Sequence, residues 1–377
     1  MQGQGNDGSE MDKKKGMVTG TDLARRQSDL IKAMRFPLIV LVVVAHSVGS
    51  FDERITLSVE GWNLYHFFSE LVSHNLCRIA VCWFFVIAGY FFFNNVPEDG
   101  LSWDWLKEKW KRRVHTLLIP FLFWNLFFVA AIVCKNFLFA KFGIIGTSAG
   151  EMEGVRQGPL FWFITGPIDF PLWFMRDLMV MVLISPIVFR AFRKTPTWAN
   201  IVILLILYAL PYDTVILTWR GYFFFSLGAC LAVNGSNMLA LCRKVEWPAY
   251  IGAVILLPIA AFYQNAPSHE WLLRAFYPAG MISFMNMMDR IAANGKVKNW
   301  LTDLASTVFF IYAAHEVYIL GWTKGLFQRL LGTGLAATWI SYLLVPVVVI
   351  LVCAMLYKAL ERILPHTLAF CCGGRGK

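Results

Sequence analysis

Charged residues are scarce in this 377-residue chain. They make up 15% of the sequence, whereas 58% of the residues are hydrophobic and 16% are aromatic. A typical soluble domain carries about 25% charged residues, so this composition excludes a water-soluble enzyme and a disordered protein. It also excludes a nucleic-acid-binding domain despite the formal net charge of +10, because the Lys and Arg residues lie in short clusters between long apolar runs. We therefore expect a polytopic membrane protein embedded in the lipid bilayer.

The cysteines provide neither a disulfide framework nor a zinc site. No CxxC motif is paired with a second pair of ligands. Five of the eight cysteines lie in or beside apolar runs, where a free Cys behaves as a small hydrophobic residue. These are Cys77, Cys82, Cys134, Cys230 and Cys353. The sequence therefore predicts no disulfide and no bound metal.

A signal peptide is also missing from the first 28 residues, which are polar and Gly-rich. We predict a disordered cytoplasmic tail over residues 1–28, a transmembrane domain over 29–362 and a short cytoplasmic C-terminal tail over 363–377. Apolar segments in the domain predict an all-α transmembrane bundle of about ten helices. Their bounds are roughly 36–50, 71–93, 116–139, 172–189, 198–211, 220–234, 248–263, 270–288, 304–322 and 339–357. The segments 198–211 and 220–234 fall short of the ~20 residues of a perpendicular span, so they are candidates for partly re-entrant helices, and eight spans is the alternative.

The distribution of positive charge sets the orientation of the bundle. If the N-terminus is cytoplasmic, 24 of the 34 Lys and Arg residues fall in inner segments and 7 in outer segments, while the rest lie within apolar runs. Membrane proteins concentrate Lys and Arg in their cytoplasmic segments. Both termini are therefore expected in the cytoplasm.

Several ionisable or polar side chains interrupt the apolar segments, and an ionisable group there costs at least ~2.5–3.5 kcal/mol on insertion scales. At a rise of about 1.5 Å per residue, they share one level, from the middle of the membrane to its outer leaflet. They are His46, Arg78, Asn125, Arg176, Arg274, His315 and Glu316. This common level predicts a polar cavity in the outer half of the bundle. The alternative is that the pairs Arg176–Asp177 and His315–Glu316 satisfy polar groups of neighbouring helices.

Five stretches of the sequence occur together in one family of membrane enzymes. The first is MRFPLIVLVVVAHS, in which Arg35 and His46 form an R-x10-H motif, and the second begins at Arg78 and reads RIAVCWFFVIAGY. The others are WKRRVHTLLIPFLFWN, PLWFMRDLMVMVLISPI and STVFFIYAAH. In this order and spacing they resemble the acyltransferase 3 family of integral-membrane O-acyltransferases, over about residues 28 to 362. Two positions depart from the family pattern, with Lys32 where many members have Asp and Ala88 where Ser is usual.

The resemblance implies transfer of an acyl group, acetyl above all, from cytoplasmic acetyl-CoA or another acyl-CoA. The acceptor would be a hydroxyl of a cell-surface glycan or lipid-linked glycan, and the location the inner membrane of a bacterium. His46 occupies the position of the family's essential histidine, and a neutral imidazole suits a base that takes a proton from the attacking hydroxyl. Glu316, at a comparable depth, is the candidate to orient this base. Arg35 at the cytoplasmic entrance is expected to bind the donor phosphates, and Arg78 the thioester carbonyl or the oxyanion.

The remaining polar candidates are expected to line the cavity or bind the acceptor. They are Asn125, Trp173, Arg176, Arg274 and His315. Trp173, like Trp83 and Trp162, suits stacking on a sugar face, although an aromatic belt at the membrane interface explains these residues equally well. A transporter or flippase of a lipid-linked or anionic substrate is the alternative function, because it also needs Arg and His inside the membrane. Thermal stabilisation by coenzyme A distinguishes the enzyme from the transporter.

Overall fold

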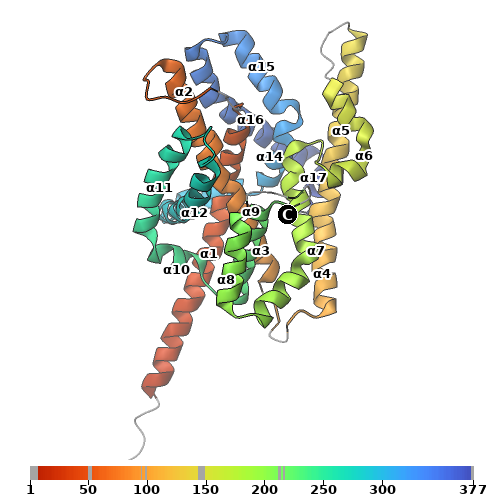
Figure 1. Ribbon diagram of the computed structural model, residues 1–377. Coiled ribbons are helices and arrows are strands. Elements are labelled where there is room, and N and C mark those ends of the chain that lie inside the picture. Colours follow the sequence, from red (N-terminus) through yellow and green to blue (C-terminus); the bar gives the residue numbers. More distant parts are fainter. Residues whose placement is uncertain are drawn as a thin grey trace, which may run out of the picture.

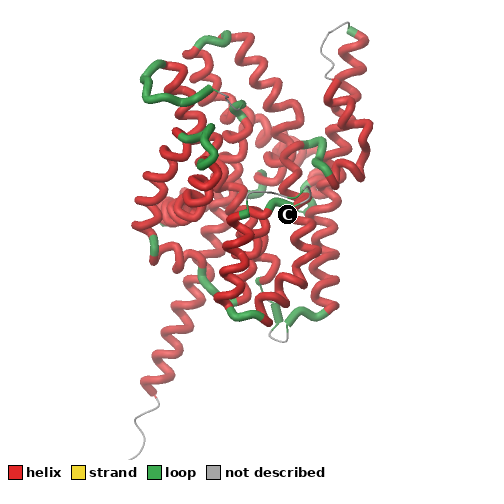
Figure 2. The backbone as a smooth tube through the Cα atoms, in the orientation of Figure 1, coloured by secondary structure: helices red, strands yellow, loops and turns green. Residues whose placement is uncertain are grey.

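The computed structural model describes residues 7–49, 53–94, 96–97, 100–142, 149–210, 214 and 217–374, with side chains from residue 22 onward except those of 149, 150 and 197. Every regular element in these ranges is a helix (Figure 2). The predicted all-α bundle is therefore confirmed.

The helices follow one another with short connections (Figure 1). The α-helices are α1 (Asp7–His46), α2 (Gly61–Ser69), α3 (Ile79–Phe93), α4 (Trp103–Arg113), α5 (Ile119–Lys141), α6 (Ala149–Ile164), α7 (Trp173–Lys194), α8 (Thr197–Ala209), α9 (Trp219–Val233), α10 (Met238–Lys244), α11 (Glu246–Phe262), α12 (His269–Ala292), α13 (Gly295–Leu304), α14 (Val308–Ala314), α15 (Leu320–Leu331), α16 (Leu335–Ile363) and α17 (Pro365–Cys371). Tighter or wider turns join several of them, namely η1 (Glu70–Asn75), η2 (Leu76–Arg78), η3 (Val114–Leu118), η4 (Phe170–Leu172) and η5 (His315–Ile319).

Each of the ten apolar segments of the sequence overlaps one or more of these helices. Among the described residues, four helical stretches are long and apolar enough to cross a membrane, and the number rises to six if each of two bent pairs forms one span. The apolar helices Trp198–Ala209 and Glu246–Phe262 are shorter. This arrangement is that of a multi-pass membrane protein whose spans are unequal in length.

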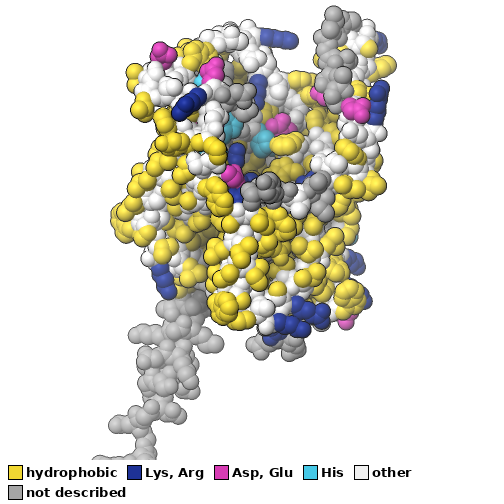
Figure 3. Space-filling view, in the orientation of Figure 1, with side chains coloured by type: hydrophobic (Ala, Val, Ile, Leu, Met, Phe, Trp, Pro, Cys, Tyr) yellow, Lys and Arg dark blue, Asp and Glu magenta, His cyan; other side chains and the backbone are white. Residues whose placement is uncertain are grey.

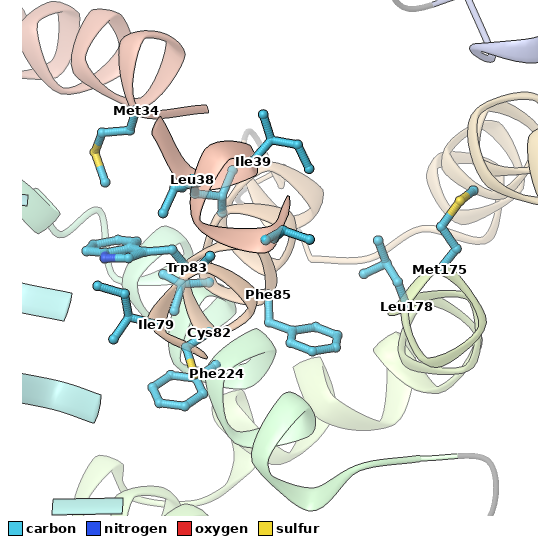
Figure 4. Close-up of a cluster of buried hydrophobic side chains, with 14 of the residues drawn as sticks. Met34, Leu38, Ile39, Ile79, Cys82, Trp83, Phe85, Met175, Leu178 and Phe224 are labelled. Atoms are coloured by element: carbon cyan, nitrogen blue, oxygen red, sulfur yellow. The ribbon is translucent and has the colours of Figure 1, made fainter. Parts of the chain in front are cut away.

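The core of the bundle is built around α3. Buried side chains of α1, α3, α7 and α9 form one apolar cluster, in which Leu38 of α1 and Phe224 of α9 lie on different sides of α3 (Figure 4). α3 and α9 touch backbone to backbone. A Cβ atom on Gly89 would lie 2.0 Å from the Phe225 carbonyl oxygen, and one on Gly228 would lie 2.1 Å from that of Val86. Glycine at both positions therefore permits the close approach that membrane helices use for packing.

α8 and α9 form a short hairpin whose tip lies below the outer end of α7. The backbone N–H of Thr218, just before α9, donates to Asp177 Oδ2 at 3.0 Å. Asp177 is seven residues into the helical stretch that begins at Phe170, which places it about 10 Å below its start. The hairpin therefore turns inside the bundle, as its short apolar segments allow.

Both ends of the domain extend beyond the limits expected from sequence. α1 begins at Asp7, within the segment for which composition predicts disorder. Arg26 forms an ion pair with Asp289 at 2.9 Å, and buried Gln27 donates to the Tyr90 hydroxyl at 2.9 Å. The packed domain therefore starts a few residues before the predicted boundary, because these polar side chains find partners on neighbouring helices.

The predicted C-terminal tail also contains structure. Residues 365–371 form α17, and Cys371 and Cys372 are buried. The Trp124 indole N–H of α5 donates to the Cys371 carbonyl oxygen at 3.1 Å. The segment after α16 therefore packs against α5 up to the last described residues.

Candidate active site

The His46 imidazole lies where α1 ends. The Lys324 ammonium group of α15 donates to the His46 carbonyl oxygen at 2.8 Å, and a cation at this position stabilises the C-terminus of a helix. His46 Nδ1 is 2.8 Å from the Val42 carbonyl oxygen. Because a carbonyl only accepts, Nδ1 carries the proton of the neutral ring and Nε2 keeps a lone pair. The sequence predicts a helix through residue 50, so the end of α1 at His46 is a feature of the structure alone.

A second histidine faces His46. The ring centroids of His46 and His315 are 5.2 Å apart and the rings are nearly perpendicular. His315 is fully buried, and its Nδ1 contacts the carbonyl oxygens of Ile311 and Tyr312 at 3.0 and 2.9 Å. Its Nε2 is buried without a hydrogen-bond partner. His315 therefore also presents an unprotonated Nε2, held from behind by the main chain.

The local backbone that carries His315 and Glu316 is irregular. The π-helical turn η5 separates α14 from α15, and within it Tyr318 has a φ of 62°, the only positive φ of a non-glycine residue in the described ranges. Such left-handed backbone in a bulky residue is strained and persists where surrounding contacts impose it. The Tyr318 ring stacks on Trp322, with 5.4 Å between the centroids. The break in the helix thus lies directly beside the two histidines.

Glu316 completes a triangle of polar atoms. Ligand-type atoms of His46, His315 and Glu316 all lie within 4.8 Å of one another. A point no more than about 2.8 Å from all three exists for any such triangle, and this is the distance of an O–H···N or O–H···O hydrogen bond. The triangle is therefore wide enough to hold one oxygen atom in contact with all three side chains.

Asp169 lies beside this triangle and was not predicted from sequence. It is fully buried, and neither carboxylate oxygen has a hydrogen-bond partner. Burial raises the pKa of Asp169 well above its usual range, and the charge of Glu316 adds to the increase. Asn125 fixes the backbone here, because its Oδ1 accepts from the N–H groups of Ile168 at 3.0 Å and Asp169 at 3.4 Å. Asn125 itself is buried, so it positions this loop and does not line an open cavity.

Arg78 supplies a cation near the level of His46. His74 Nε2 is 3.2 Å from the Gly49 carbonyl oxygen, and both Arg78 and His46 lie about one helical turn inward of this contact along their own chains. The Arg78 side chain is exposed and makes no hydrogen bond or ion pair with any described residue. Its charge is therefore available to a substrate.

Arg35 lies on the same face of α1 as His46. His46 follows Arg35 by 11 positions, which is about three turns and roughly 17 Å along the helix axis. Arg35 is half-buried and, among the described residues, has no hydrogen-bonding or ion-pair partner. One helix face therefore carries an unpaired guanidinium and, about three turns later, the imidazole.

Two predicted cavity residues have structural roles at the tip of the α8–α9 hairpin. Arg176 donates to Asp177 Oδ1 at 2.9 Å, while the other oxygen of Asp177 accepts from Thr218. Arg274 donates to the carbonyl oxygens of Tyr208 and Leu210, the second at 2.8 Å, and pairs with Glu270. Arg176 and Arg274 are both nearly inaccessible to solvent. They satisfy backbone and charge inside the bundle, which is the alternative that the sequence left open for Arg176.

The tryptophans do not form a stacking surface. Trp83 and Trp162 are buried, with their indole N–H groups bonded to the carbonyl oxygens of Met281 and Gly154. Trp173 is half-buried and its ring lies 6.3 Å from that of Phe85. The expectation that these residues bind a sugar face is not supported by their positions, because each packs into the bundle.

The space-filling view shows where polar side chains gather. Histidine, basic and acidic side chains lie together in a hollow in the upper half of the face in Figure 3, above a mostly hydrophobic surface. A separate cavity of about 410 Å³ lies beside residues 22–30 of α1, far from His46. Its charged lining is balanced, with Asp22, Arg25, Arg26, Asp29, Asp289 and Lys298. None of His46, His315 and Glu316 lines this cavity.

Sequence reasoning missed two residues of the site, Asp169 and Lys324. Lys324 follows a predicted span and was counted with the outer positive charges, and Asp169 lies in a loop rich in Gly and Pro. The one feature of the sequence that could have identified Asp169 and Lys324 is that each lies close to the end of an apolar segment. Neither position has a periodicity or motif that points toward His46.

Comparison with known proteins identifies the family of the chain. The succinoglycan biosynthesis protein ExoH of Rhizobium meliloti (strain 1021) is 24% identical to this chain over 352 residues, which cover 92% of each of the two proteins. No solved structure matches. The model of the acyltransferase 3 family, described as an acyltransferase domain, matches residues 29–358, a range that holds His46, His315, Glu316 and both unpaired arginines. Because that match spans most of the chain, this multi-pass membrane protein belongs to the acyltransferase 3 family.

Proposed function

We propose that the protein transfers an acyl group, acetyl in the first instance, from cytoplasmic acyl-CoA to a hydroxyl of a cell-surface or envelope glycan. The observation that carries this proposal is the position of His46. Its Nδ1 is held by the Val42 carbonyl, its carbonyl by Lys324, and its Nε2 is free to accept a proton. A positioned neutral imidazole is the group that general-base catalysis at neutral pH requires.

The chemistry needs one proton acceptor and one site for negative charge. The acceptor hydroxyl attacks the thioester carbonyl carbon as His46 Nε2 takes its proton, and the C–O bond forms. The carbonyl oxygen becomes an oxyanion, and the guanidinium of Arg78 stabilises it in this proposal. The C–S bond then breaks, and the proton on His46 goes to the departing thiolate. Glu316, within 4.8 Å of the imidazole, stabilises the positive charge that the ring carries in between.

The two substrates approach from opposite sides in this proposal. Arg35, about 17 Å inward of His46 on the same helix face, binds a phosphate of the donor through charge-assisted hydrogen bonds. The extended pantetheine arm of coenzyme A then runs outward along α1 toward His46. The acceptor enters through the hollow on the opposite side of His46.

A glycan acceptor is supported by the relative ExoH, which matches nearly the whole chain and is named as a succinoglycan biosynthesis protein. The composition and the excess of inner positive charge support a bacterial inner membrane, with both termini in the cytoplasm. The site has no feature that selects acetyl over a larger acyl group, and the first experiment therefore compares donors.

The test is acyl transfer in membranes that contain wild-type protein or His46→Gln at equal expression. Radiolabelled acetyl-CoA and a dicarboxylic acyl-CoA such as succinyl-CoA are supplied with envelope glycan. We expect label in glycan with the wild type from at least one donor, and a loss of about 100-fold or more in the variant. His115→Gln is the matched control. The His115 ring also contacts the carbonyl oxygen four residues earlier, but His115 is exposed and lies outside the site. Full activity of His46→Gln would disprove the mechanism, and absence of transfer together with absence of stabilisation by coenzyme A would favour a transporter.

A further inference from the structure

The triangle of His46, His315 and Glu316 has the composition of a metal site as well as that of a general base. We propose that these three side chains bind Zn²⁺, and that the bound ion inhibits the enzyme by occupying the Nε2 lone pair of His46. The inhibition rests on the proposed acyl transfer, whereas the binding of zinc does not.

The donor set matches the preference of the ion. Zn²⁺ is commonly held by two imidazole nitrogens and one carboxylate oxygen, with water as the fourth ligand. A histidine that binds metal usually donates its other ring N–H to a carbonyl or carboxylate, which fixes the ring. His46 and His315 both do so through Nδ1, to the carbonyls of Val42 and of Ile311 and Tyr312. Both Nε2 atoms are therefore held ready before any ion binds.

His315 Nε2 also lacks any other partner. It is buried, and no hydrogen bond reaches it within the described structure. A buried polar atom without a partner costs free energy, and coordination of a metal removes that cost. The imidazole is too deep for bulk water, so an occupant of the triangle is the group that can reach it.

The geometry needs only a small contraction. The ligand atoms lie within 4.8 Å of one another, so a central atom is no more than about 2.8 Å from each, against about 2.1 Å in a zinc site. Each side chain therefore closes in by about 0.7 Å or less. His46 is the last residue of α1, and Glu316 lies in the irregular turn η5. Both positions adjust more easily than the interior of a regular helix.

Carboxyl, ammonium and aromatic groups surround the triangle. Asp169 and Glu316 contribute two carboxyl groups, and their charges act on each other. Lys324 is the basic group whose charge acts on Glu316, and its ammonium is already bonded to the His46 carbonyl oxygen. The ring of Phe170, 6.1 Å from that of His46, covers one side. Glu316 is therefore the acidic ligand of the triangle, and the Lys324 ammonium that acts on it is already engaged by the His46 carbonyl oxygen.

Binding is tested directly on full-length protein purified in detergent through a tag without histidine. Isothermal titration with ZnCl₂, in the absence of donor and acceptor, is expected to show one ion per chain with a Kd in the micromolar range or below. His315→Gln and Glu316→Gln are expected to weaken binding by about tenfold or more, while the matched control His115→Gln leaves it unchanged. Co²⁺ in place of Zn²⁺ is expected to give the visible absorption of a four-coordinate site in the wild type and to lose it in His315→Gln. No binding, or binding that neither variant weakens, overturns the proposal.

Inhibition is measured in the acyl-transfer assay. Zn²⁺ is expected to lower the rate reversibly, to be relieved by a chelator, and to compete with the glycan acceptor but not with acyl-CoA, because the ion occupies the position of the attacking hydroxyl. A rate that falls when the chelator is added would show that the metal supports the reaction, and would overturn the inhibitory role. Zinc binding without acyl transfer from any donor would instead refute the proposed function and leave the metal site standing.

Discussion

Asp169 is an acidic residue that is buried in the folded protein without a hydrogen-bond partner for its carboxylate. Its two carboxylate oxygens are buried and lack hydrogen bonds, and the charge of Glu316 acts on it. Burial of an ionised carboxylate is costly, so the protonated form is favoured in the folded state. In the unfolded chain the same group ionises near its ordinary pKa of 3.8. The folded state therefore holds a proton that the unfolded state releases.

This difference makes stability depend on pH. Because the folded pKa of Asp169 is raised, its contribution to the free energy of unfolding falls as pH rises above the unfolded value, and the fall continues up to the folded pKa. Asp169→Asn removes the titrating group with little change of shape. We expect the melting temperature of the variant to exceed that of the wild type by more at about pH 8 than at about pH 5. Thermal unfolding of both proteins in the same detergent measures this.

The matched control is Asp303→Asn, at an exposed acid in the last turn of α13. It should shift the melting temperature equally at the two pH values. A difference between wild type and Asp169→Asn that shrinks as pH rises would contradict the assignment, because that trend belongs to an acid stabilised in its ionised form.

Some residues of the site could be predicted from sequence and others could not, depending on whether they lie in an apolar segment. His46, His315 and Glu316 were predicted to lie at one depth, because depth follows from counting residues along each apolar segment, and the structure brings them together. Lys324 and Asp169 lie outside regular spans, where residue counting gives no height. The close approach of three ligand-type atoms was not predicted, because the search for metal ligands rested on cysteine spacing. Here the ligands come from helices almost 270 residues apart in the chain.

At the level of elements, the α8–α9 hairpin explains why several charges are buried in the outer half of the bundle. Backbone groups inside a membrane must be satisfied by protein, and the tip of this hairpin turns about 10 Å below the start of α7. Arg274 bonds the last carbonyls of α8, and Asp177 accepts from the N–H group at the start of α9. Arg274 is a cation at the C-terminus of α8, and Asp177 is an anion at the N-terminus of α9. Each charge therefore interacts favourably with the dipole of that helix.

The arginines of the bundle should therefore respond differently to substitution. Arg274→Met leaves the carbonyls of Tyr208 and Leu210 without their donor and weakens the pairing of Glu270, so we expect a loss of about 3–5 kcal/mol of stability and a large loss of folded protein. Arg78→Met removes a side chain that pairs with no described residue, and it should change stability by about 0.5 kcal/mol or less. Acyl transfer should nonetheless fall sharply in Arg78→Met. Fluorescence-detected size exclusion after a heat step measures the folded fraction.

Equal loss of folded protein in the two variants would refute this division between supporting and reacting arginines. Arg274→Lys serves as a further control, because one ammonium group replaces a planar guanidinium that bonds two carbonyls and a carboxylate at once. It should recover only part of the lost stability.

The hairpin also shows where sequence reasoning at the level of elements stops. The shortness of segments 198–211 and 220–234 predicted incomplete spans, and the structure agrees for the tip. Which side chains support that tip does not follow from the same pattern. Arg176 has Asp177 beside it and Arg274 has Glu270 four residues earlier, whereas Arg78 has no acidic residue within four positions. Only the position of α8 and α9 shows which backbone groups the first two arginines support. The end of α1 at His46 could not be predicted for a similar reason, because Lys324, which bonds the His46 carbonyl oxygen, comes from a distant helix.

At the scale of the whole molecule, the polar groups are divided into two layers. Arg26 and Arg243 form ion pairs with Asp289, and Lys298 forms one with Asp29, beside residues 26–29 of α1. From Asp29 to His46 the helix rises about 25 Å, which is most of the ~30 Å hydrocarbon core. The reactive cluster therefore lies most of a membrane thickness away from these ion pairs, and the unpaired Arg35 lies between the two layers. A membrane enzyme that joins a cytoplasmic donor to an external acceptor needs this separation.

The orientation of these layers can be tested on the intact protein. Thr333 lies in the exposed connection between α15 and α16, and Lys194 is the exposed last residue of α7. With the basic clusters in the cytoplasm, Thr333→Cys should react with a membrane-impermeant maleimide in cells whose outer envelope is opened, whereas Lys194→Cys should react only after the inner membrane is permeabilised. The wild type reports background, since most native cysteines are buried and exposed Cys134 lies on the apolar helix α5. Reaction of both variants from the same side would place the two layers on one side of the membrane, and a donor and an acceptor could then not approach His46 from opposite faces.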